Sequence, residues 1–203
     1  MNRRGLSLIE MTIAIGITAV IGLAIASMMA AATNSLASKD DGRQSAIRLA
    51  TTQVRLGAYI APSNCLLDKA NEMLTFWFND INESNSVNID EVRWIQYDSA
   101  SKTLSVKFVN FPDDWTPQMF ESANIECNSL TDYSQLLEEF ELNNHIEKIT
   151  LVDSMTNCKF WTNNINTLEA TQVSIRFSLE SVYGETKDAI IDEGIRLHQS
   201  PSD

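Results

Sequence analysis

The feature that most limits how this chain can fold is an uncharged stretch of 22 residues, from 11 to 32. In a helix with a rise of about 1.5 Å per residue, about 20 apolar residues cross the roughly 30 Å hydrocarbon core of a bilayer. Arg3 and Arg4 precede the stretch, and positive charge beside a span keeps that end in the cytoplasm. The stretch therefore predicts one transmembrane helix, with the following residues outside the cytoplasm.

Three alternative kinds of segment fit this stretch less well. A secretory signal peptide has a shorter apolar region, followed by a small-residue cleavage site. A plain membrane anchor fits the length but gives no reason for Glu10, because a carboxylate in a span costs about 2.5–3.5 kcal/mol on insertion scales. A buried helix of a soluble protein does not need 22 uncharged positions. Glu10 therefore indicates a function beyond anchoring.

Residues 4–10 read Arg-Gly-Leu-Ser-Leu-Ile-Glu. Followed by the apolar run, this motif resembles the class III signal of type IV pilins and type II secretion pseudopilins. The resemblance implies that a prepilin peptidase cuts between Gly5 and Leu6, so that residues 1–5 are a leader. It also implies that the new amine at Leu6 is methylated and that Glu10 guides subunit assembly. Phenylalanine is commonest after the cut in this family, and Leu6 is a conservative apolar departure from it.

Charge arguments support a role for Glu10 in assembly. After cleavage, the Leu6 amine is a cation at the membrane, and both it and the Glu10 carboxylate are costly in lipid unless they pair. Pairing between neighbouring subunits would set an axial register. Small residues recur every four positions and form one ridge, along which helices can approach closely. The residues of this small-residue ridge are Ala14, Thr18, Gly22, Ala26 and Ala30.

Composition limits the partners and the chemistry. The formal net charge of −12 argues against nucleic-acid binding, which needs a basic patch. Neither His145 nor His198 lies in a nucleophile or metal motif. We therefore predict no catalytic residue, no metal, no cofactor and no enzyme activity. The acidic residues at 188, 192 and 193 could supply oxygens to calcium, but their spacing is unlike an EF-hand.

The three cysteines are Cys65, Cys127 and Cys158. Outside the cytoplasm a disulfide is permitted. The separations fit either Cys65–Cys127 or Cys127–Cys158, and three unpaired core thiols are a further alternative.

After the span, residues 33–61 form an amphipathic continuation of the helix that Pro62 closes. Gly42 marks the expected position of a bend or local melting. One apolar stripe at helical spacing predicts packing on the body of the subunit. Its residues are Ile47, Leu49, Val54, Leu56 and Ile60.

The remainder, residues 62–203, reads as an extracytoplasmic, β-rich globular domain. Strands are expected from β-rich or alternating runs, and a short helix capped by Asp132 runs to Leu142. Residues 112–117 read as a turn-rich insertion. The expected strands are 73–78, 92–97, 103–109, 146–152, 158–161, 173–179 and 189–197.

The predicted fold is α+β. A long N-terminal helix, transmembrane over residues 6–32, packs on an antiparallel sheet, as in a pilin-like ladle. The order of elements is similar to that of minor J-type pseudopilins and W-type minor pilins.

The resemblance implies a structural minor subunit of a type IV pilus or type II secretion pseudopilus. It implies a bacterial inner-membrane protein with one span and a periplasmic domain, which then enters the pilus or pseudopilus. The implied partners are prepilin peptidase, other pilin or pseudopilin subunits and the inner-membrane assembly platform. The alternative is a membrane-anchored extracytoplasmic binding domain that never polymerises.

Overall fold

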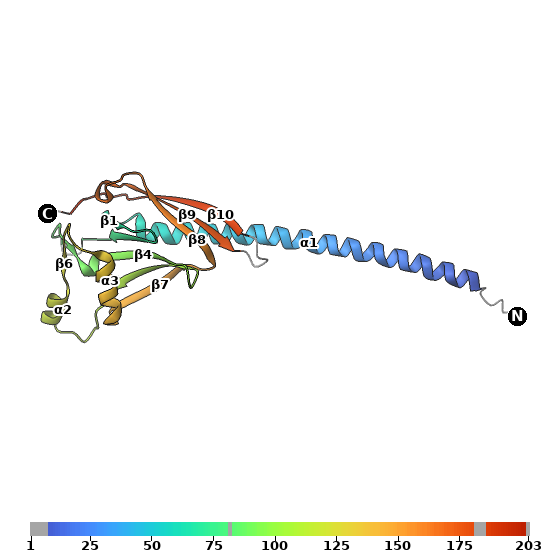
Figure 1. The fold of residues 1–203 in the computed structure, drawn as a ribbon, viewed down its shortest axis with the longest axis horizontal. Helices are drawn as coiled ribbons and strands as arrows, with labels where there is room; N and C mark the ends of the chain where they lie inside the picture. Colours follow the sequence, from blue (N-terminus) through green and yellow to red (C-terminus); the bar gives the residue numbers. More distant parts are fainter. Residues whose placement is uncertain (1–7, 81–82, 181–185, 202–203) are drawn as a thin grey trace. The chain divides into compact units, whose positions relative to one another are not determined.

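The computed structural model describes residues 8–80, 83–180 and 186–201; within the first helix, the side chains of residues 8–10, 14, 32, 34–42, 44 and 45 lie outside the description. The chain divides into two compact units, Met1–Ile47 and Arg48–Asp203. Helix α1 (Leu8–Ile60) contributes to both units (Figure 1). The helical assignment continues through Gly42, where the sequence suggested a bend.

The last three turns of α1 form part of the Arg48–Asp203 unit. Leu56 and Ile60 are fully buried there, and Leu49 packs against the same core. The predicted stripe is wrong at Ile47 and Val54, whose exposed fractions are 54% and 73%. Each of these residues precedes an inward leucine by two positions, which is a rotation of about 200° around the helix. They therefore lie on the opposite face.

Five strands form one antiparallel sheet in the order β1-β2-β4-β5-β7. Each strand pairs with its neighbour, and the register shifts at two places, where Leu67 of β1 and Leu151 of β7 have no directly opposite partner. The strands are β1 (Cys65–Lys69), β2 (Met73–Trp77), β4 (Val92–Asp98), β5 (Thr103–Val109) and β7 (Ile146–Val152). Every residue of β2 is buried, so both faces of this sheet are covered.

A second antiparallel sheet has the order β10-β9-β8. Alternate residues of β9 point into the core, which confirms the alternation seen in the sequence. Its strands are β8 (Met155–Thr162), β9 (Gln172–Glu180) and β10 (Thr186–Gly194).

The remaining elements are short. Strands β3 (Val87–Asn88) and β6 (Glu126–Cys127) pair with each other. Two α-helices, α2 (Pro117–Ala123) and α3 (Tyr133–Leu142), and two 3₁₀ helices, η1 (Ile89–Glu91) and η2 (Thr167–Glu169), complete the unit.

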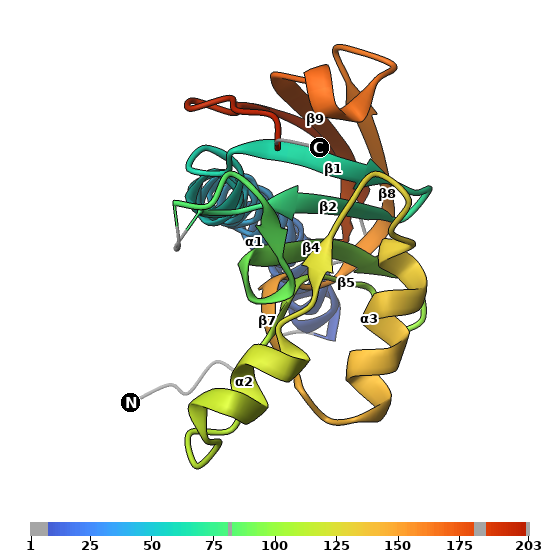
Figure 2. The same ribbon diagram turned by 90° about the vertical axis from the view of Figure 1, so that its left-hand side faces the viewer.

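Two cores lie on opposite faces of the five-stranded sheet. The first core joins the end of α1 and the three-stranded sheet to one face; its members include Leu56, Ile60, Leu74, Ile95, Val106 and Phe177. The second core joins α3 to the other face; its members include Trp77, Trp94, Tyr133, Leu137 and Phe140. Figure 2 shows the end of α1 and α3 on opposite sides of this sheet.

Several predicted elements are confirmed, whereas β1, α2 and the short elements β3, β6, η1 and η2 were not predicted. The hairpin of β4 and β5 forms without the glycine that such a loop usually needs. The Asp98 side chain stabilises the loop by accepting hydrogen bonds from Ala100 N (2.9 Å) and Ser101 Oγ (2.6 Å). The positive φ that a glycine would adopt is taken by Lys102, at 54°. Strand β1 was not predicted, and α2 forms where an insertion of turns was expected. Thr116 caps α2 by accepting from Met119 N.

Candidate functional site: the N-terminal helix

The segment Met11–Ala31 of α1 is the part of the described chain that is long and apolar enough to cross a membrane. It has 21 residues and a mean hydropathy of 2.3, and none of it is buried. Large apolar side chains are exposed on every side of the helix, among them Ile13, Ile17, Val20, Leu23 and Met28. Such a surface is typical of a helix whose surroundings are lipid or other apolar helices.

Four members of the small-residue ridge have described side-chain positions. Thr18, Gly22, Ala26 and Ala30 are all exposed, and a Cβ built on Gly22 would meet no atom within 4 Å. Ala14 belongs to α1, but its side chain lies outside the described part. The ridge is therefore open to another helix along the stretch that the structure describes.

Two hydroxyl groups within this helix are satisfied by its own backbone. Ser27 Oγ donates to Ala24 O (2.8 Å), and Thr33 Oγ1 donates to Met29 O. A hydroxyl that is bonded in this way avoids the cost of an unpaired polar group in an apolar medium. These polar residues are therefore compatible with a lipid environment.

The predicted processing residues lie largely outside the described part of the chain. Gly5 and Leu6 precede its first residue, so neither the cleavage site nor the methylated amine is described. Glu10 lies in the first turns of α1, but the description does not extend to its side chain. The roles of these three residues therefore remain predictions from the sequence.

The three cysteines are buried and carry free thiols. Neither predicted disulfide is formed, and the alternative of three unpaired core thiols is the one observed. Cys65 and Cys127 belong to the second core, whereas Cys158 belongs to the first. Burial raises the pKa of each thiol to about 12. All three are therefore protonated at neutral pH and are poor nucleophiles.

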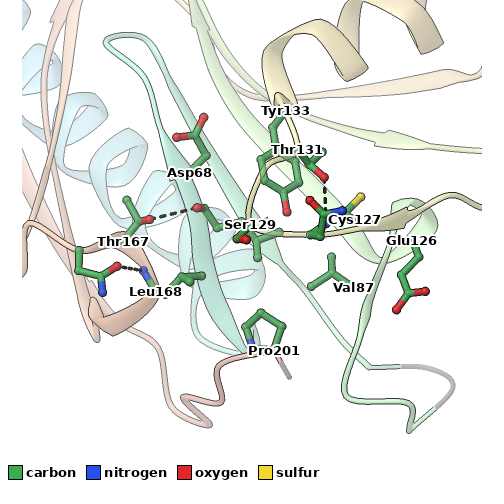
Figure 3. A pocket seen from close by; sticks show the side chains of 13 residues that line it. Asp68, Val87, Glu126, Cys127, Ser129, Thr131, Tyr133, Thr167, Leu168 and Pro201 are labelled. Carbon is green, nitrogen blue, oxygen red and sulfur yellow. Dashed lines mark hydrogen bonds between the residues drawn. The ribbon is translucent and has the colours of Figure 1, made fainter. Parts of the chain in front are cut away.

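A cavity of about 480 Å³ lies in the Arg48–Asp203 unit, between β1, β6 and η2 (Figure 3). Cys127 and Tyr133 both line it, and burial raises the pKa of both groups above their ordinary values. Thr167 Oγ1 is already engaged because it donates to Leu67 O (3.0 Å). The cavity therefore offers polar contacts, and the Cys127 thiol and Tyr133 hydroxyl that line it are protonated at neutral pH.

The histidines and the suggested calcium residues have structural contacts. His145 stacks edge-on against Trp115, with ring centroids 5.0 Å apart. Asp188 accepts from Ser178 Oγ (2.6 Å), and Asp192 accepts from Ser174 Oγ. Within the described ranges, no group of three histidine, cysteine or acidic side chains is placed to hold a metal ion.

Comparisons with known proteins return nothing for this chain. No protein-family model matches it, and neither a curated protein nor a solved structure matches it.

Proposed function

We propose that this chain is a minor, structural subunit of a type IV pilus or type II secretion pseudopilus, with a pilin-like α+β fold. One combination of observations carries the proposal. The signal-like motif of residues 4–10 directly precedes Met11–Ala31, a segment of α1 that is apolar and exposed. The same helix supplies Leu56 and Ile60 to the core of a domain of antiparallel sheets.

The proposed mechanism assigns two roles to the N-terminal half of α1. First, the segment holds the subunit in the inner membrane as a single span, with its domain in the periplasm. Second, Glu10 pairs with the Leu6 amine of a neighbouring subunit, because both charges are costly in an apolar medium and cheaper as a pair. The open ridge around Gly22 then allows the helices to approach closely.

The proposed partners follow from these roles. Prepilin peptidase removes residues 1–5, and the assembly platform of the inner membrane moves the processed subunit into the filament. Other pilin or pseudopilin subunits then surround the helix. The exposed apolar surface of Met11–Ala31 supports partners of this kind, because it has no covering within the described chain.

The first test is the intact mass of the protein expressed with and without a prepilin peptidase. We expect the peptidase to remove residues 1–5, so that the chain begins at Leu6, with or without one added methyl group. Gly5→Leu is the matched control and should stay uncut. An uncut wild-type chain would contradict the proposal and favour the membrane-anchored binding domain that does not polymerise.

A second test separates processing from assembly. Glu10→Gln keeps the shape of the side chain but removes its charge, so cleavage should continue while other subunits no longer co-purify after crosslinking. Thr33→Val, whose hydroxyl bonds within α1, is the control and should retain co-purification. Equal recovery of other subunits with both variants would remove the assembly role of Glu10.

A further inference from the structure

A groove of about 1170 Å³ lies between the β1–β2 turn and the edge strand β8. It will be called the β8 groove. The turn at residues 70–72 forms one wall, residues 157–162 of β8 form the other, and the loop at 163–165 also lines it. Because β8 is the last strand of the three-stranded sheet, one of its edges is free of strand partners in the described structure.

The register of the sheet identifies which backbone groups of β8 face this edge. Asn163 N–H donates to Gln172 O (3.2 Å), so this pair is hydrogen-bonded across β8 and β9. Hydrogen-bonded pairs alternate along an antiparallel ladder, so Trp161 and Lys159 also bond to β9. The amide and carbonyl groups of Cys158, Phe160 and Thr162 therefore point away from β9.

These outward groups form a template for another strand. In the described part of the chain, the backbone groups of Cys158, Phe160 and Thr162 form no hydrogen bond with the backbone of another segment on this side of β8. The bulge of β8 lies before Asn157, so the register from 157 to 162 is regular. Six residues at about 3.3 Å each give an edge of about 20 Å, which is the length of an ordinary strand.

The charge of the groove is opposite to that of the whole chain. Two lysines, Lys69 and Lys159, and one acid, Glu72, line it, whereas the chain carries a net charge of −12. Lys159 lies directly opposite Arg176 in the register, and like charges in that position are destabilising. Arg176 forms an ion pair with Asp188, with 3.4 Å between Nη2 and Oδ2. Lys159, by contrast, forms no ion pair with any residue that the structure describes.

Apolar side chains lie beside these charges. Trp161 follows Lys159 by two positions, so the two share the outward face of β8, and the exposed fraction of Trp161 is 43%. Ile165, in the adjoining loop, is fully exposed. We propose that the β8 groove binds an extended acidic peptide segment of another polypeptide, which adds to β8 as a strand and contacts Lys159 and Trp161.

The test uses the full chain in detergent micelles and a fluorescein-labelled hexapeptide of alternating glutamate and valine. Fluorescence anisotropy should show saturable binding, weaker at higher salt. Lys159→Glu should weaken binding by about tenfold, because it replaces an attraction with a repulsion. Lys148→Glu is the matched control, since Lys148 is an exposed lysine on β7 that lies opposite Lys107. It should leave binding unchanged.

A second peptide tests strand addition itself. Proline in place of the central valine keeps the charge but removes an amide donor, so this peptide should not bind. Equal binding of both peptides, equal loss with both lysine variants, or no binding at all would overturn the proposal. Concentration-dependent self-association that the glutamate-valine peptide displaces would also overturn it, because the occupant would then be a second copy of the chain.

Discussion

Two parts of α1 carry similar apolar side chains in opposite environments. In Met11–Ala31, Val20 and Leu23 have exposed fractions of 66% and 72%. In the last turns, Leu56 and Ile60 are completely buried by the sheets of the same chain. Burying such a side chain stabilises by about 1.5–3 kcal/mol, so the first part gains this energy only from an apolar environment outside the described chain.

The two parts also differ in how polar groups are used. The stretch from 11 to 32 has no charged residue, and the Ser27 hydroxyl within it donates to the helix's own backbone. Near its end, by contrast, α1 uses arginines to contact the β-rich domain. Arg48 donates to Glu180 O (3.1 Å) and Asp153 O (2.9 Å), and Arg55 donates to Leu151 O (2.9 Å). A uniformly apolar helix needs an apolar solvent, whereas a helix with one apolar face needs a core.

The largest expected effect is in the buried part. Leu56→Ala should lower the free energy of unfolding by about 2–5 kcal/mol, because it leaves a cavity in the first core. Val54→Ala, on the exposed face of the same helix, should change it by less than about 0.5 kcal/mol. Denaturant titration followed by tryptophan fluorescence measures both. Equal losses would mean that this helix face does not pack as described.

The next largest effect is expected when a charge is placed in Met11–Ala31, because this segment is proposed to lie in the membrane. Ile21→Arg should cost about 2.5–3.5 kcal/mol on insertion and reduce the fraction of the protein that resists carbonate extraction from membranes. Val54→Arg places the same charge on the exposed face near the other end of α1 and should leave that fraction unchanged. If both variants stay in the membrane pellet, Met11–Ala31 is not the anchor.

A smaller effect is expected at the arginine contacts. Arg48→Met keeps the aliphatic stem but removes the hydrogen bonds to Glu180 O and Asp153 O. The expected loss is about 1–3 kcal/mol, measured by the same titration. Arg43→Met, at an exposed position in the other unit, should have almost no effect. A loss at Arg43 equal to that at Arg48 would contradict the division of the chain at residue 47.

The smallest effect is expected from pH. The folded pKa of Cys158 is about 12, above its ordinary value of 9.0, because burial disfavours the thiolate. The contribution to stability is therefore fully present below about pH 9 and is lost as the pH rises toward 12. Because Cys65 and Cys127 contribute in the same way, Cys158→Ala should lessen the fall in stability between pH 9 and 10.5 without abolishing it. At pH 8, a thiol reagent should label three cysteines only after unfolding; rapid labelling of the native protein would contradict the burial.

Local patterns predicted much of the β-rich domain. The strict alternation in 173–179 and the capping position of Asp132 are signals within a few residues, and β9 and α3 form where they indicate. Strand β1 and helix α2 were missed for different reasons. The sequence of β1, Cys-Leu-Leu-Asp-Lys, does not alternate in polarity, and the register with β2 skips Leu67. In α2 the signal was present, since Thr116 and Pro117 are a usual helix start, but the prolines and aspartates around it favoured turns.

The sequence by itself determined that residues 11–32 need an apolar environment, because length and lack of charge decide that without any tertiary contact. It also determined the class of the rest, antiparallel strands with a short capped helix. Only the tertiary structure decided that Leu49 rather than Ile47 packs inward, that Cys65 and Cys158 lie in separate cores, and that β8 has a free edge. These outcomes depend on which distant segments meet, and the energies of such contacts are set by packing in three dimensions rather than by spacing along the chain.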